Sequence, residues 1–168
     1  MQMKRQRPTE GLDSMTGRID MKKNKALVGA LNELLADSIV FAQKLHHYHW
    51  RVRGESFYQL HARFEELYDR FGDLSDEFAE RILMIGGAPL GSLAQALEAA
   101  SVQEDESVPG ARAMVENVRA DLQAFHAKVR AAGALADDAG DKGSAAVLDP
   151  IGDHLEKELW MLGAYLDG

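Results

Sequence analysis

The sequence predicts an all-α protein, folded as a four-helix bundle with a short helix in the long connection between the second and third helices. Apolar residues recur at spacings of three, four and seven along four long segments, which is the period of one helix face. The alternation of apolar and polar residues that marks a β-strand occurs nowhere at useful length. Gly and Pro residues separate the segments from one another.

The first long helix is predicted over residues 26–52 and the second over about residues 57–85. Between them, Gly54 breaks the pattern, and Ser56-Phe57-Tyr58-Gln59 has the form of a capping box that would satisfy free backbone amides. The second helix ends at Gly86-Gly87-Ala88-Pro89, a strong terminator.

Residues 90–106 are predicted to form a connection with a short helix inside it, because Ser92-Leu93-Ala94-Gln95 is another capping box. A third long helix follows near Pro109, and residues 133–143 are expected to form a loop. The fourth helix covers the region from Val147 to Leu166, and Pro150 predicts either a helix start with Asp149 as its cap or a kink.

Composition narrows the class of protein. A length of 168 residues fits one domain with a sizeable core, and the absence of cysteine excludes disulfides and thiolate metal sites. No uninterrupted run of about 18 apolar residues occurs, so no membrane-spanning helix is expected. The charged N-terminus is followed by no apolar stretch, so it is no secretory signal, and a cytoplasmic protein is expected.

The net charge of −8 is unevenly distributed. Residues 1–25 carry seven basic and three acidic side chains, a net charge of +4, so the remainder carries −12. We therefore expect a flexible basic tail over residues 1–25 and a bundle domain over residues 26–168. A basic tail on an acidic body is one pattern associated with nucleic-acid binding, and a solvated terminus explains it equally well.

The second helix carries polar residues able to bind metal: His61, Glu65, Asp76 and Glu80. They lie within about 100° of one another around the helix, beside its apolar face. His61 with Glu65, and Asp76 with Glu80, have the spacing of four that lets two side chains meet one ion. The two pairs are separated by about 16 Å along the axis, and ligand bonds are only about 2 Å long, so one chain cannot place both pairs on one metal.

A second copy of this helix, packed antiparallel across a two-fold axis, would bring His61 and Glu65 of one chain to Asp76 and Glu80 of the other. Gly72 lies on the same stripe, near its midpoint, and would allow the two helices a close approach. The alternative is an ordinary charged flank of a surface helix. The spacing thus predicts at least a dimer if the residues bind metal.

His49 lies on the apolar face of the first helix, within His46-His47-Tyr48-His49-Trp50. Such a histidine is either a hydrogen-bonded core residue or a further ligand. Two imidazoles and three carboxylates without sulfur suit ferrous iron or manganese, and zinc less exclusively.

These residues resemble those of the Dps family, the miniature ferritins that protect bacterial DNA. The resemblance covers most of residues 26–166. It rests on His49-Trp50, His61, Glu65, the stretch from Leu74 to Arg81 that holds Asp76 and Glu80, and the stretch from His154 to Leu162. The Glu-x-x-His motif of ordinary di-iron bundles is absent from the sequence.

The resemblance implies a ferritin-like fold with a crossover connection and a hollow shell of twelve subunits. One subunit would supply His49, His61 and Glu65, and its two-fold partner Asp76 and Glu80. Ferrous iron would be oxidised there, commonly by hydrogen peroxide in preference to O₂, and the ferric mineral stored inside. The position of Glu65 is often aspartate in the family, so Glu65 is either a direct ligand or an outer residue.

Further roles implied by the resemblance have simpler alternatives. Trp50 and Tyr48 would carry electrons as radicals during the oxidation. The alternative is that both only pack against neighbouring side chains. Asp137, Asp138 and Asp141 would line acidic pores through which iron enters the shell. The alternative is that they are ordinary acidic residues of a solvent-exposed loop. DNA would be bound by the basic tail through Lys4, Arg5, Arg7, Lys22, Lys23 and Lys25.

Two other functions remain open. One is a DNA-compacting shell whose metal site is weak or occupied by zinc. The other is a helical bundle without a metal role, which requires the ordered spacing of five candidate ligands to be accidental.

Overall fold

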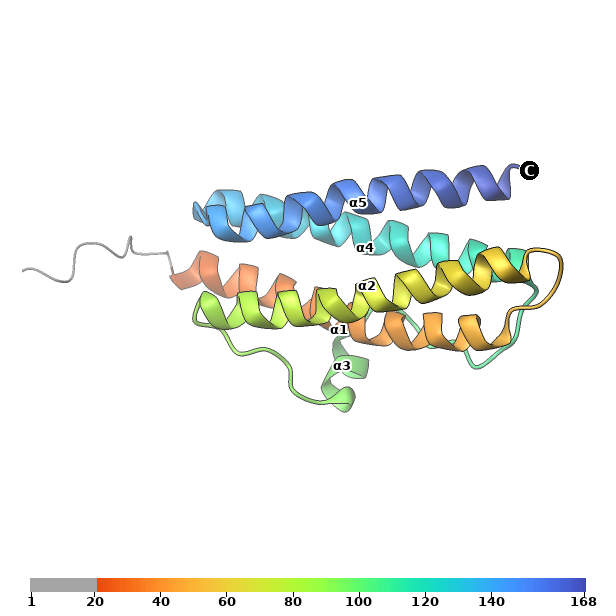
Figure 1. The fold of residues 1–168 in the computed structure, drawn as a ribbon. Helices are drawn as coiled ribbons and strands as arrows, with labels where there is room; N and C mark the ends of the chain where they lie inside the picture. The colour runs from red at the N-terminus through yellow and green to blue at the C-terminus, as the bar shows by residue number, and fades with distance from the viewer. Residues whose placement is uncertain (1–20) are drawn as a thin grey trace, which may run out of the picture.

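The computed structural model describes residues 21–168, which form five α-helices and no β-strand. The long helices are α1 (Met21–Arg51), α2 (Phe57–Met84), α4 (Ala111–Ala139) and α5 (Lys142–Leu166), and the short α3 (Leu93–Ala99) lies in the connection between α2 and α4. Figure 1 shows two hairpins, α1 with α2 and α4 with α5, packed side by side with α3 outside the bundle. The predicted all-α bundle, with a short helix in its long connection, is confirmed.

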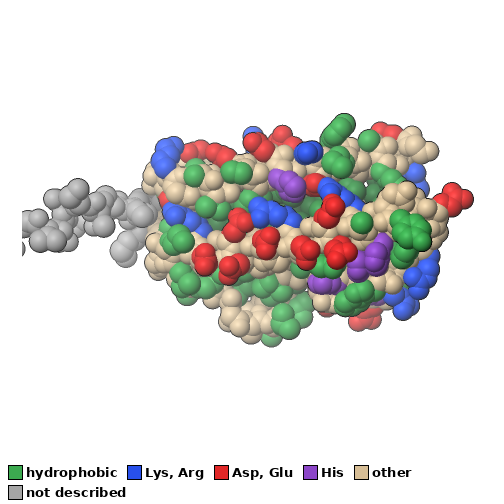
Figure 2. Space-filling view, viewed as in Figure 1, with side chains coloured by type: hydrophobic (Ala, Val, Ile, Leu, Met, Phe, Trp, Pro, Cys, Tyr) green, Lys and Arg blue, Asp and Glu red, His purple; other side chains and the backbone are tan. Residues whose placement is uncertain are grey.

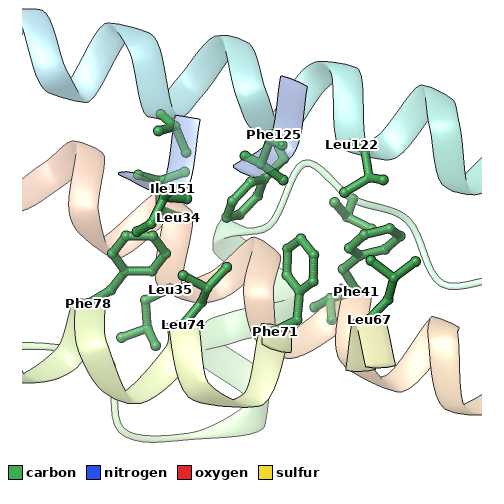
Figure 3. Close-up of a cluster of buried hydrophobic side chains, with 14 of the residues drawn as sticks. Leu34, Leu35, Phe41, Leu67, Phe71, Leu74, Phe78, Leu122, Phe125 and Ile151 are labelled. Carbon is green, nitrogen blue, oxygen red and sulfur yellow. The ribbon is translucent and has the colours of Figure 1, made fainter. Parts of the chain in front are cut away.

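Aromatic rings fill the middle of the bundle (Figure 3). The ring of Phe71 meets Phe41 edge-on at 4.7 Å and Phe125 at 5.0 Å, so one cluster joins α1, α2 and α4. Such edge-to-face pairs contribute about 0.5–1.5 kcal/mol each beyond the burial of their area. The centre of the bundle is therefore an apolar contact between its two hairpins.

The long connection is fixed to the bundle by a buried carboxylate. Asp37 is completely buried and accepts hydrogen bonds from the backbone amides of Ser101 (2.6 Å) and Val102 (3.0 Å). Lys128 pairs with the same carboxylate at 2.8 Å. Further along, the Tyr48 hydroxyl donates a hydrogen bond to Asp105. The crossover is thereby held against α1 and α4.

Two predictions about helix ends are wrong. Ser56 is the first residue before α2, but its side chain makes no capping hydrogen bond. Residues 133–143 are mostly helical, because α4 continues to Ala139 and ends at Gly140, whose φ of +69° is the left-handed conformation that glycine tolerates. The other predicted capping box, at the start of α3, does form its cap, since the Ser92 side chain accepts a hydrogen bond from the Gln95 backbone amide at 3.2 Å.

The start of α5 also differs from the prediction. The Asp141 side chain accepts a hydrogen bond from the Ser144 amide at 3.1 Å, which begins the helix well before Pro150. Pro150 therefore lies inside the helix rather than at its start. Its neighbours Leu148 and Ile151 are buried in the core, and this packing offsets the backbone hydrogen bond that proline cannot make.

The first helix begins at Met21, five residues before the predicted start, so Lys22, Lys23 and Lys25 belong to α1. Residues 1–20, which include Lys4, Arg5 and Arg7, lie outside the described residues. By length and composition alone, α1 is long and apolar enough to cross a membrane, although half of its most apolar stretch is buried. The core helix of a bundle passes the same test, so this is weak support for a membrane span.

Candidate metal centre

Three of the predicted ligands meet where the end of α1 lies beside the first turns of α2. The ligand atoms of His49, His61 and Glu65 all lie within 4.8 Å of one another, and this is the one such group of His, Asp or Glu side chains in residues 21–168. His49 is buried, His61 half-buried and Glu65 exposed. The group therefore opens from the bundle toward the surface of α2.

The two histidines orient each other. His49 Nδ1 lies 2.7 Å from the His61 carbonyl oxygen, and His61 Nδ1 lies 2.9 Å from the His49 carbonyl oxygen. A carbonyl oxygen only accepts, so each Nδ1 carries a proton, and in the neutral form of each ring the lone pair is on Nε2. The rings are stacked at 3.7 Å with 19° between their planes. Both imidazoles are thus prepared to bind a metal through Nε2.

The short turn between α1 and α2 makes this arrangement possible. Gly54 has a φ of +106°, which L-residues rarely adopt, and it reverses the chain within a few residues. Phe57, at the start of α2, stacks on the outer face of His61 at 5.0 Å. The turn therefore brings two histidines twelve positions apart into direct contact.

Asp76 and Glu80 are exposed and lie outside this group of ligands. In Figure 2 acidic side chains form a row along α2 that ends beside a histidine. The exposed acidic residues of α2 are Glu65, Glu66, Asp69, Asp73, Asp76 and Glu80. Asp76 follows Glu65 by about 16 Å along the helix, so one chain presents two separate parts of the predicted ligand set.

The interior of the bundle offers no competing site among the described residues. The middle is occupied by phenylalanine and leucine side chains (Figure 3). Two carboxylates are buried there, Asp37 and Glu158, and both are paired, with Lys128 and Arg63 respectively. The one candidate group of metal ligands in residues 21–168 is therefore where α1 and α2 meet, and it opens toward the surface of α2.

Comparisons with known proteins decide the family. Residues 28–168 match the family model of the ferritin-like domain. The chain is 42% identical over 137 residues to the DNA protection during starvation protein of Brevibacillus brevis, a match covering 82% of this chain and 92% of that protein. The chain belongs to the Dps family of ferritin-like proteins.

Solved Dps structures share the fold. The crystal structure of a Dps protein from Bacillus brevis has a TM-score of 0.84 at 39% identity, covering 86% of this chain and 97% of that one. The Dps protein of Vibrio cholerae O1 also has a TM-score of 0.84, at 34% identity, covering 88% and 93%. That protein is described as a member of a broad superfamily of ferritin-like diiron-carboxylate proteins.

The two aromatic residues considered as electron carriers differ in their surroundings. Tyr48 is completely buried, and its hydroxyl donates to Asp105 and accepts from Asn117, whose Nδ2 lies at 2.9 Å. Burial, together with Asp105, raises the pKa of Tyr48 well above its ordinary value. Its hydroxyl is thus bonded to the long connection and to α4, and not to the group formed by His49, His61 and Glu65. Trp50 is 58% exposed, with its ring 5.5 Å from that of His46.

The three aspartates considered for an iron pore also have different positions. Asp141 caps α5 and pairs with Arg81 at 2.6 Å, so it already has a structural role. Asp138 lies in the last turn of α4. Asp137 lines a hollow of about 480 Å³ between α4 and α5, whose other acidic residues are Asp149 and Asp153.

Tyr68 is a residue that the sequence reasoning missed. Its ring stacks on His46 at 3.7 Å and meets His49 edge-on at 5.3 Å. Tyr68 follows Glu65 by three residues and His61 by seven, so it lies on the same stripe of α2. That spacing was the available signal.

Proposed function

We propose that this Dps-family chain oxidises ferrous iron at sites shared between two copies of the chain, with hydrogen peroxide preferred over O₂. The observation that carries the proposal is the pair of histidines with both Nε2 atoms free beside Glu65, while Asp76 and Glu80 lie out of reach on the same helix. The site has the ligand chemistry that ferrous iron prefers, but one chain supplies only part of it.

The residues have separate tasks in this reaction. His49 and His61 hold Fe(II) through Nε2, and the carboxylates add negative charge that stabilises Fe(III) more than Fe(II). Their charge therefore favours loss of an electron from the bound ion. Each ferrous ion gives up one electron, a peroxide molecule accepts two as its O–O bond breaks, and hydrolysis of the ferric product releases protons.

The second half of each site is assigned to the partner in an antiparallel pair of α2 helices. In that arrangement Asp76 and Glu80 of one copy meet His61 and Glu65 of the other, and symmetry creates the site twice. Gly72 supports this, because it is exposed and a Cβ added there meets no atom of its own chain within 4 Å. A glycine at this position leaves room for the backbone of a neighbouring helix to approach closely.

The names of the relatives support a wider function. We propose a cytoplasmic shell of twelve copies that stores ferric mineral and protects DNA by consuming iron and peroxide together. The relative in Brevibacillus brevis is named for DNA protection during starvation, and one in Bacillus subtilis, 38% identical over 143 residues, is named a general stress protein. The hollow beside Asp137 is our candidate for the passage of iron, in preference to Asp141.

Mixed assemblies test the shared site. One variant, His61→Asn, lacks a histidine ligand, and the other, Asp76→Asn with Glu80→Gln, lacks the opposing carboxylates. Each alone should oxidise Fe(II) no faster than buffer. Co-expressed with different affinity tags and purified through both, they should recover about a quarter of the wild-type rate. About half of the pairs in a randomly mixed shell are mixed, and a mixed pair keeps one intact site of two.

The opposite outcome, no oxidation by the mixed assemblies, would contradict a shared site. If one chain supplied every ligand, co-assembled variants would stay inactive, since no chain in the mixture has a complete set. A mixture of wild-type chains with a chain carrying all three substitutions controls for the effect of tagging and co-expression. Wild-type protein that oxidises Fe(II) no faster than buffer, with peroxide or with air, would contradict the proposed function itself.

A second candidate function is a DNA-binding shell with a weak or zinc-occupied metal site, favoured by the names of the relatives. We propose that the basic N-terminal residues make the phosphate contacts, which many copies would multiply. Removing residues 1–25 takes away all six of the basic residues assigned to DNA, and should abolish DNA retardation at low salt. Unchanged retardation by the shortened chain would assign DNA binding to another surface.

A further inference from the structure

The two histidines of the proposed site belong to a longer series of aromatic contacts. Phe57 stacks on His61, His61 stacks on His49, and His49 meets the ring of Tyr68 at right angles, 5.3 Å between centroids. The ring of Tyr68 stacks in turn on His46, at 3.7 Å with 22° between the planes. Each ligand imidazole therefore has the other imidazole on one side and a non-ligand aromatic ring on another.

His49 depends on such contacts because it is attached at the last turn of α1. Its Nδ1 hydrogen bond to the His61 carbonyl restrains one atom of the ring, and stacking on His61 restrains one face. Neither contact alone prevents the ring from tilting about that hydrogen bond. Tyr68 meets the imidazole at 88° and so blocks the tilt from a perpendicular direction.

Resting on the proposed function, we infer that Tyr68 is a positioning residue of the iron site: its ring, held by His46, keeps the His49 imidazole oriented with Nε2 toward the metal. The ring does not touch the iron, and it acts through His49. This role accounts for the position of Tyr68, which is half-buried, stacks on His46 and lies on the same stripe of α2 as His61 and Glu65.

The hydroxyl of Tyr68 adds to this arrangement. The Tyr68 side chain shares a hydrogen bond with the carboxylate of Glu65, one turn earlier on α2. A protonated hydroxyl donates to a carboxylate and restrains its direction. The ring therefore serves His49, and the hydroxyl makes a smaller contribution through Glu65.

Leucine and phenylalanine substitutions separate positioning from packing. Tyr68→Leu removes the ring, and Tyr68→Phe keeps the ring but loses the hydroxyl. Tyr165→Leu is the matched control, because Tyr165 on α5 is also half-buried against the core and makes no ring contact with the histidines. The full chain is loaded with Co(II) without air, and its visible spectrum reports the geometry of the ligands. Thermal unfolding and the KM and kcat for Fe(II) are measured alongside.

We expect Tyr68→Leu to weaken Co(II) binding and raise the KM for Fe(II) about 10-fold or more, as loss of an outer partner of a metal ligand commonly does. Its Co(II) spectrum should change, while its melting temperature falls no further than that of Tyr165→Leu. Tyr68→Phe should stay within about threefold of wild type.

Two results would overturn the inference: a Tyr68→Leu variant with wild-type affinity and spectrum, or a Tyr68→Phe variant as impaired as Tyr68→Leu. If Tyr68→Leu does not fold, His46→Leu removes the support behind the ring and should weaken Co(II) binding in the same direction; wild-type binding by that variant would also overturn the inference. Wild-type protein that binds no Co(II) and oxidises no Fe(II) would instead contradict the proposed function.

Discussion

Replacing Gly72 with leucine should stabilise a single chain and weaken the pairing of two chains. Gly72 is exposed in the middle of α2, and an added Cβ meets no atom of the chain within 4 Å. Glycine in an exposed helix interior costs about 0.8–1.0 kcal/mol relative to alanine, and leucine is nearly as good a helix former as alanine. For one chain alone, the free energy of unfolding should therefore rise by roughly 0.5–1 kcal/mol.

The effect on a pair has the opposite sign if the α2 helices cross at Gly72. Helices usually pack with axes about 8–10 Å apart, and two added leucines would meet each other at a contact that glycine had kept close. Overpacking costs about 1–3 kcal/mol for each inserted side chain, and the two-fold axis inserts two. The pair should be weakened by roughly 2–6 kcal/mol, which is at least about a 30-fold loss of affinity.

Sedimentation velocity at several concentrations measures the assembly, and Fe(II) oxidation on the same samples measures the shared site. Gly72→Leu should shift toward single chains and lose oxidation in proportion, without any loss of helix by circular dichroism. Gly29→Leu is the control, because Gly29 is also an exposed helical glycine with open space around it, but lies on α1. A Gly72→Leu protein with wild-type size and oxidation rate would refute the antiparallel α2 pair.

Three further predictions concern the fold. Asp37→Ala should lower the free energy of unfolding in urea by about 3–5 kcal/mol, since it leaves backbone amides and a lysine without their buried partner; a loss below about 1 kcal/mol would contradict this. Gly87→Ala should lower the melting temperature, because its Cβ would stand 2.7 Å from a Val28 methyl group, and an unchanged melting temperature would contradict the crowding. Burial alone would raise the pKa of Asp141, but hydrogen bonds from Ser144 and Arg81 together outweigh it and lower that pKa. Its stabilising effect is thus complete above the ordinary pKa and lost as the pH falls through the lowered value, so Asp141→Asn should flatten the acid side of the melting curve against pH; parallel curves would argue against it.

The helices were predictable because the pattern that marks a helix is local in the sequence. Some helix ends were not predictable, because where a helix ends depends on contacts with residues elsewhere in the chain. Apolar spacing identifies each long helix directly. Residues 133–143 carry glycines and paired aspartates that suggest a loop, but the chain stays helical until Gly140, where a left-handed residue is available. Pro150 suggested either a helix start or a kink within the helix, and the first alternative is wrong because the cap at Asp141 and the buried residues beside Pro150 fix the start earlier.

The candidate site was partly visible in the sequence for the same reason. The spacing of His61 and Glu65 on one helix predicted that they approach each other, and spacing alone also showed that Asp76 lies too far along the helix. The mutual hydrogen bonds of the two histidines depend on how the turn after α1 folds back, which no helical period describes. Tyr68 was overlooked because an aromatic residue at helical spacing resembles ordinary core packing.

The candidate carboxylate ligands lie outside the core, and this position has a physical reason. Burying several carboxylates in the bundle would cost several kcal/mol for each unpaired charge, and the two buried carboxylates of the described chain are already paired. Phenylalanine rings fill the middle instead, so the bundle has a complete core without any metal. On the exposed face of α2 the acidic side chains are solvated, so their charge carries no such cost in the single chain. Folding and the proposed iron chemistry should therefore be separable, and for that reason isosteric changes at Asp76 and Glu80 should report on the proposed reaction rather than on stability.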